Sequence, residues 1–131
     1  MAIEEAIYSR LSGYSPLSAL VGARIYPSKL PQDVTFPALC YLKISETSEH
    51  IFGGDIEART ARIQVSAFAD NYYGVKNISK QIKAALRRYA GTIGTVTIED
   101  ILIEGGEMDL YEPETGIHHI PIDASVIYKE T

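Results

Sequence analysis

Two adjoining stretches decide the fold: ARTARIQVSAFA, residues 58–69, and NYYGVKNISKQIKAALRRYA, residues 71–90. Alternation in the first predicts a strand with one buried face, which carries Ala61, Ile63, Val65 and Ala67, while Thr60, Arg62, Gln64 and Ser66 take the other. In the second, apolar residues recur at helical spacing, and the buried stripe holds Val75, Ile78, Ile82, Ala85, Leu86 and Tyr89. Gly91 is expected to close this long helix.

The N-terminal side supplies two short helices and a partner strand. Residues 2–13 have the periodicity of an amphipathic helix, and SPLSALVG, residues 15–22, predicts a second one with Ser15 as N-cap and Gly22 as the stop. The proline-rich connection 23–37 is expected to hold a short strand at 24–26. ALCYLKISET, residues 38–47, predicts a strand antiparallel to 58–69, with one face formed by Ala38, Cys40, Leu42 and Ile44.

Residues 92–130 are expected to form a long two-stranded element. Its last strand has one clean apolar face, made of Ile120, Ile122, Ala124, Val126 and Tyr128. Pro121 cannot donate to a ladder, which predicts an edge or a bulge there. The order of elements predicts the α+β class: an antiparallel or mixed sheet with hairpins, packed against two or three helices, the long one at about 71–90. No linker divides the chain, so residues 1–131 are expected to form a single domain.

Charge is unevenly distributed along the chain. The formal net charge is −5, which argues against a general attraction to nucleic acid. The long helix nevertheless carries an acid-free basic row, made of Lys76, Lys80, Lys83 and Arg87. Residues 99–116 contain seven acids and no Lys or Arg, among them Glu107, Asp109, Glu112 and Glu114. The basic row is either a solvated helix face or a contact surface for an acidic partner, and such a chain can dock head-to-tail on copies of itself.

The lone cysteine, the N-terminus and the hydropathy also limit the class of protein and its cellular compartment. Cys40 cannot form an intramolecular disulfide and is expected to be a buried strand thiol. The N-terminus has acids where a signal peptide needs basic residues, and no apolar run is long enough to span a membrane. Folding in the cytoplasm and no membrane partner are therefore expected.

The segment DLYEPETGIHHIPID, residues 109–123, is the strongest candidate for chemistry. Pro113 and Gly116 are typical of a hairpin turn, which places Glu112 and Glu114 at a solvated tip. His118 and His119 are strand neighbours, so their side chains leave on opposite faces and do not match a metal-ligand spacing. A site that combines one of them with Asp109 or Asp123 matches no recognised motif.

Other motifs give no active site either. The glycine pairs at 53–54 and 105–106 lack the features of a phosphate loop, and no serine lies in a nucleophile elbow. The tyrosines of NYYG, residues 71–74, fit packing or an interface better than base stacking. The chain is therefore expected not to be an enzyme, with no cofactor, no metal and no catalytic residue.

Nearly the whole chain resembles the tail-completion proteins of long-tailed bacteriophages and prophages, also called tail-terminator or head–tail joining proteins. The resemblance is carried by the LSALVGARIY phrase at 17–26, by FP leading into a strand, by the hairpin and long helix, and by DLYEPETGIHH before the final strand. It implies a small α+β structural protein of the virion, made in the host cytoplasm. It also implies a hexameric ring at the head-proximal end of the tail tube, which stops tube growth and joins the tail to the head connector.

The resemblance further implies three partners: copies of the chain, the tail tube protein and the head–tail connector, with DNA passing through the lumen without sequence-specific binding. We expect the basic row to meet the acidic hairpin of a neighbour, with contacts from Lys76, Lys80, Lys83, Arg87, Glu107, Asp109, Glu112, Glu114 and His118. The alternatives are another neck adaptor of the same virion and a DNA-binding module that uses the basic helix.

Overall fold

The computed structural model describes residues 2–50, 57–105 and 108–130. Within these ranges the chain forms three helices and a seven-stranded mixed sheet, which confirms the α+β class. The helices are α1 (Ile3–Gly13), α2 (Ser15–Val21) and α3 (Tyr72–Leu86). The strands are β1 (Ile25–Pro27), β2 (Ala38–His50), β3 (Glu57–Ala69), β4 (Gly91–Ile93), β5 (Val96–Glu104), β6 (Leu110–Glu112) and β7 (Ile117–Glu130).

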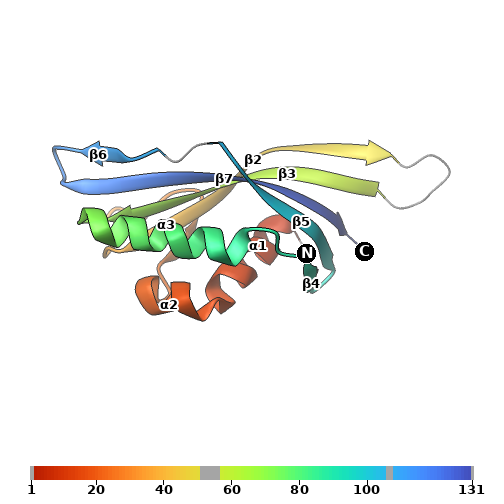
Figure 1. Ribbon diagram of the computed structural model, residues 1–131, viewed down its shortest axis with the longest axis horizontal. Coiled ribbons are helices and arrows are strands. Elements are labelled where there is room, and N and C mark those ends of the chain that lie inside the picture. The colour runs from red at the N-terminus through yellow and green to blue at the C-terminus, as the bar shows by residue number, and fades with distance from the viewer. Residues whose placement is uncertain (1, 51–56, 106–107, 131) are drawn as a thin grey trace.

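The sheet order is β1-β2-β3-β7-β5-β4, and β6 pairs with the start of β7. Only β1 runs parallel to its neighbour, β2, and the remaining pairs are antiparallel. All three helices lie on one side of the sheet (Figure 1). At one end the hairpin β6–β7 extends beside the first turn of α3, and at the other the β2–β3 hairpin projects past the helices as an arm (Figure 1).

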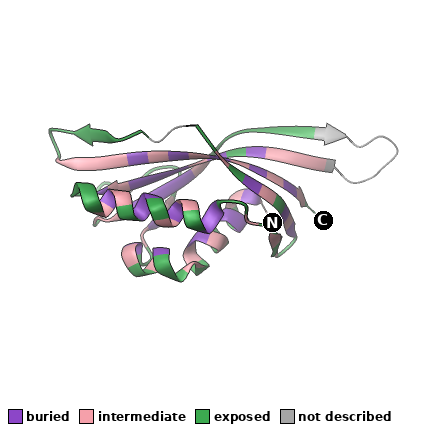
Figure 2. Cartoon of the chain, viewed as in Figure 1, coloured by how far each residue is buried: buried purple, intermediate pink, exposed green. Residues whose placement is uncertain are grey.

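The core lies between the helices and the inner face of β3, β7 and β5. Register places Ala61 opposite Val126, Ile63 opposite Ala124 and Val65 opposite Ile122, all on this face. The stripe of α3 from Val75 to Leu86 packs onto them, as predicted, and Figure 2 shows the buried positions along α3 and the sheet. The faces predicted for β3 and β7 are therefore confirmed.

The face predicted for β2 is confirmed for its first residues, but it is not the face that meets the helices. Leu39 and Tyr41 belong to the core, whereas Ala38 and Cys40 are buried on the opposite face. Burial raises the pKa of the Cys40 thiol. A register shift at Ile44 leaves that side chain 49% exposed. Both faces of this strand are covered at its start, so a run of apolar residues does not reveal which one meets the helices.

The long helix is shorter than predicted. It ends at Leu86, and Gly91 begins β4 instead of closing the helix. Arg88 adopts a left-handed φ of 58°, and its amide donates to the Ile101 carbonyl of β5 at 2.8 Å. Bonding to a neighbouring strand therefore replaces the next helical turn.

Two local expectations also need correction. The N-cap of α2 is Tyr14, and Ser15 already lies within the helix. Pro121 lies neither at a sheet edge nor at a register shift, because β7 is a central strand. On one side it faces Ser66 of β3. On the other side, β7 pairs with β6 up to His119 and with β5 from Asp123 onward, so Pro121 falls between these two paired segments. Among the described residues no strand pairs with Pro121 on this second side, and a proline is tolerated where no ladder bond has to be donated.

Candidate functional site

The basic row of α3 forms a continuous charged surface. Asn71 caps the helix by accepting a hydrogen bond from the Gly74 amide at 2.6 Å. Because the apolar stripe faces the sheet, the basic side chains point outward around a shallow depression of about 620 Å³, lined by Lys76, Lys80, Lys83, Ala84, Arg87 and Arg88. The depression offers an anionic partner several ammonium and guanidinium groups at once.

Part of this charge is balanced within the chain. Lys76 Nζ lies 2.9 Å from Asp109, which also accepts a hydrogen bond from the Tyr72 hydroxyl at 3.0 Å. The hydrogen bond from Lys76 is the largest cause that lowers the pKa of Asp109, with a smaller contribution from Tyr72. Arg88 pairs with Asp100 at 2.8 Å. Within the described residues, Lys80 makes no ion pair, so no carboxylate of the same chain neutralises its ammonium.

Aromatic rings gather where the hairpin β6–β7 meets the first turn of α3. His118 lies 4.7 Å from the Tyr111 ring and 5.9 Å from the Tyr72 ring, and Tyr73 packs edge-on against Tyr72 at 5.8 Å. Much of the cluster remains open to water: Tyr73 is 84% exposed and Tyr111 56%. Exposed tyrosines at this density are typical of a protein interface.

The tip of this hairpin is acidic and solvated, as predicted. Gly116 has a φ of 72°, and its amide donates to the Glu112 carbonyl at 2.8 Å, which closes the turn. Glu112 and Glu114 are both exposed. The prediction for Glu107 falls outside the described residues.

His118 and His119 lie on opposite faces of β7, as predicted, and the face of His119 carries an apolar hollow. The hollow has a volume of about 440 Å³ and lies between segment 30–36 and the hairpin β6–β7. Its floor is the His119 ring stacked on Phe68, with centroids 4.3 Å apart. Burial lowers the pKa of His119, which keeps the ring neutral at pH 7. Within the described part of the chain, its buried Nε2 has no hydrogen-bond partner.

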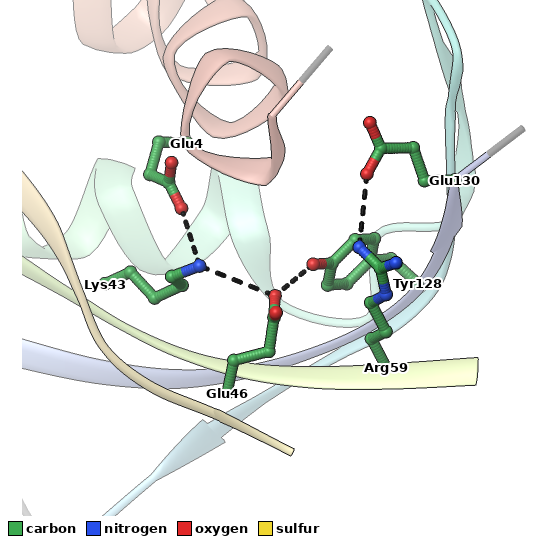
Figure 3. Close-up of polar contacts among 6 residues, drawn as sticks. All are labelled: Glu4, Lys43, Glu46, Arg59, Tyr128 and Glu130. Carbon is green, nitrogen blue, oxygen red and sulfur yellow. Dashed lines mark hydrogen bonds and ion pairs between the residues drawn. The ribbon is translucent and has the colours of Figure 1, made fainter. Parts of the chain in front are cut away.

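A polar cluster holds the root of the β2–β3 arm (Figure 3). The Tyr128 hydroxyl donates to Glu46, and Lys43 bridges Glu46 at 3.6 Å and Glu4 of α1 at 3.4 Å. Arg59 of β3 pairs with Glu130 at 3.3 Å. Burial, followed by the contact with Glu46, raises the pKa of Tyr128 to about 12. The cluster ties both strands of the arm to α1 and to the end of β7.

Across the described residues, no three His, Cys, Asp or Glu side chains lie close enough together to hold a metal ion. In those same ranges, no helix has the length and apolar character needed to cross a bilayer. Four surface features stand out: the basic depression, the aromatic cluster, the acidic tip and the apolar hollow.

Comparison with known proteins agrees with this description. The sequence model of the family described as tail completion protein gp17 matches residues 5–129. The chain belongs to this family. The match confirms the resemblance found in the sequence, and it makes the chain a structural protein of bacteriophage tail assembly. No curated protein matches the chain.

Among solved structures, the tail completion fold matches a chain of the "Virion of native gene transfer agent (GTA) particle". The TM-score is 0.77 at 14% identity, and the match covers 98% of this chain and 95% of that one. At this identity the likeness shows the shared fold. It extends along both chains, so the β2–β3 arm and the hairpin β6–β7 lie within the matched length.

The structure brings together only part of the predicted contact set. Lys76, Asp109 and His118 meet at the base of the hairpin, whereas Lys80, Lys83 and Arg87 lie further along α3. Sequence reasoning missed the hollow and the arm-root cluster. The hollow is lined by residues from segments 30–36 and 110–119 and by Phe68, and the arm-root cluster joins Glu46 to Tyr128. No local sequence pattern links positions that lie so far apart in the chain.

Proposed function

We propose that this tail completion protein closes the head-proximal end of a phage tail tube as a hexameric ring. The ring stops polymerisation of the tube and joins it to the head–tail connector, and DNA passes through its lumen without sequence-specific binding. The role is structural, with no reaction catalysed. Its partners are its own copies, the tail tube protein and the connector.

The family match over residues 5–129 is the observation that carries this proposal, since it names tail completion as the role of the family. The fold shared with a chain of a virion particle supports it. The surfaces of the molecule are also consistent with assembly, because exposed tyrosines and a basic depression lie beside an acidic hairpin tip.

A closed ring needs two different, complementary patches on each subunit. We infer that the basic depression around Lys80 is one patch and that the acidic tip of the hairpin, with Glu112 and Glu114, belongs to the other. Asp109 is already held by Lys76 of the same chain, so its main role is to fix the hairpin against α3. The tip carboxylates are left exposed for a neighbour.

The decisive experiment mixes the purified protein with tubes assembled from the tail tube protein of the same virus. Negative-stain imaging is expected to show rings on one end of each tube, and capped tubes are expected to stop growing. A protein that leaves tube ends bare and tube growth unchanged would overturn the proposal.

Two rival roles give different results in the same system. A neck adaptor that acts elsewhere would bind the connector without capping tubes. A DNA-binding module would bind duplex DNA with an affinity that falls steeply as salt rises. A ring that only lets DNA pass has little affinity for duplex at physiological salt.

A further inference from the structure

We propose that neighbouring copies associate head-to-tail by inserting Tyr73 of one copy into the apolar hollow of the next. In this contact, Lys80 of the first copy meets the acidic rim of the hollow on the second. The inference rests on the proposed ring and specifies the subunit contact that would build it.

The knob is Tyr73. It is the most exposed large hydrophobic side chain among the described residues, at 84%, while Tyr72 beside it braces its ring edge-on at 5.8 Å. The short capped turn that begins at Asn71 fixes its backbone. A tyrosine held in this way loses little side-chain entropy on binding, which is why such residues serve as anchors in interfaces.

The hollow has the size and chemistry to accept an aromatic ring. Its volume of about 440 Å³ exceeds that of one side chain, and Phe36, Phe68 and Tyr111 contribute aromatic walls. The neutral ring of His119 stacks on Phe68 and adds a further flat surface. Aromatic rings pack well against such surfaces, and a buried aromatic anchor contributes much of the energy in a typical interface.

Charge complementarity favours a second copy as the occupant. Lys80 follows Tyr73 by seven residues on the same helix face, which places it about 10 Å along α3. Glu112 lines the hollow, Glu114 lies at the adjoining tip, and Asp33 belongs to the wall segment. Among the described residues, neither Lys nor Arg lines the hollow. A knob followed by a basic row therefore matches an apolar hollow with an acidic rim.

The placement of the two surfaces allows a heterologous contact, because the two surfaces are different. The hollow includes His119, whereas the rings beside Tyr73 contact His118, so the knob and the hollow lie on opposite faces of β7. A copy cannot insert its own knob into its own hollow. Repeating the same contact adds copies in one direction, and such a chain closes into a ring when the rotation per copy allows it.

Cross-linking between two variants that each carry one added cysteine tests the contact. Asn77→Cys places a thiol one turn from Tyr73, and Thr115→Cys places one at the rim of the hollow, both at exposed positions. Cys40 is buried and reacts slowly, so it can be retained. A short bismaleimide should cross-link the two variants when they are mixed in equal amounts. We expect this result at high protein concentration in low salt and also on tube ends. Neither variant alone should cross-link. Asn77→Cys mixed with Ala19→Cys, on the exposed surface of α2, is the negative control.

Variants of the knob and of the charges complete the test. Tyr73→Ala in the Asn77→Cys protein should reduce cross-linking about tenfold or more, while Tyr73→Phe should retain it. Tyr8→Ala, which removes another exposed tyrosine, should have no effect. Lys80→Glu should weaken the link, and Glu112→Lys on the opposing copy should restore it.

The possible outcomes separate this contact from the proposed function. If rings cap tubes while the mixed variants do not cross-link, or while Tyr73→Ala has no effect, the contact is wrong and the capping role stands. If cross-linking occurs as expected and tubes stay uncapped, the contact is correct and the capping role fails. Linkage within a single variant population would indicate a two-fold contact and would also overturn the inference.

Discussion

Replacing Tyr128 by phenylalanine tests the cluster that anchors the β2–β3 arm. The side chain is 2% exposed, and its hydroxyl donates to Glu46 of β2, one of the two arm strands (Figure 3). The substitution keeps the ring in the core and removes only the hydroxyl. Glu46 retains the ammonium of Lys43 at 3.6 Å.

The expected loss follows from the chemistry of that one bond. A hydrogen bond to a charged acceptor contributes about 1.5–3 kcal/mol to the free energy of unfolding. The Glu46 side chain is 24% exposed, so water partly screens it and the lower part of that range applies, about 1.5–2 kcal/mol. For a chain of this size, the midpoint of thermal unfolding should fall by roughly 5–10 °C.

The pH dependence has a definite sign. The pKa of Tyr128 rises from 10.0 in the unfolded chain to about 12 in the folded one, so the folded state holds this proton more tightly. The stabilisation is therefore complete below pH 10 and is lost as the pH rises through the folded pKa. The upper limit of the loss is about 2.7 kcal/mol, since each pKa unit corresponds to about 1.36 kcal/mol. Tyr128→Phe should lack this part of the alkaline loss.

Urea unfolding at pH 7.5 and between pH 9 and 12 measures both effects. Tyr111→Phe is the matched control, because Tyr111 is 56% exposed and should change the unfolding free energy by less than about 0.5 kcal/mol. A double-mutant cycle with Glu46→Gln should give a coupling of about 1 kcal/mol. Wild-type stability in Tyr128→Phe, together with an unchanged alkaline loss, would refute the reasoning.

Three further predictions concern assembly, acid stability and the core. Reversing Lys80 and Lys83 to Glu should raise the apparent dissociation constant of the ring about tenfold or more at low salt, and ring assembly that survived this change would contradict the charge contact. Because burial lowers the pKa of His119, the unfolding free energy should fall as the pH drops below 6.5, and urea titrations should show a smaller fall in His119→Phe. Ile82→Ala should cost about 2–5 kcal/mol, because its side chain is fully buried against the sheet, and a loss below about 1 kcal/mol by denaturant titration would argue against that packing.

The sequence predicts many individual features of the site. It predicts little of how these features are arranged relative to one another in space. The basic row, the hairpin turn at Gly116 and the divergent histidines follow from periods of 3.6 and 2 and from turn chemistry. The ion pair between Lys76 and Asp109 does not follow from these patterns, because the hairpin and the helix meet only in the folded sheet, where β7 pairs with β3. Within one copy, this ion pair holds the hairpin against α3.

The sequence by itself determined the α+β class, the buried faces of β3, β7 and α3, and the family, because each depends on local periodicity or on phrases read in order. Only the tertiary structure decided which face of β2 meets the helices and where α3 ends. Residues on both faces of β2 are buried at its start, and a hydrogen bond from the Arg88 amide to the Ile101 carbonyl replaces the next turn of α3. The hollow beside His119 also exists only in three dimensions, because distant segments form its walls.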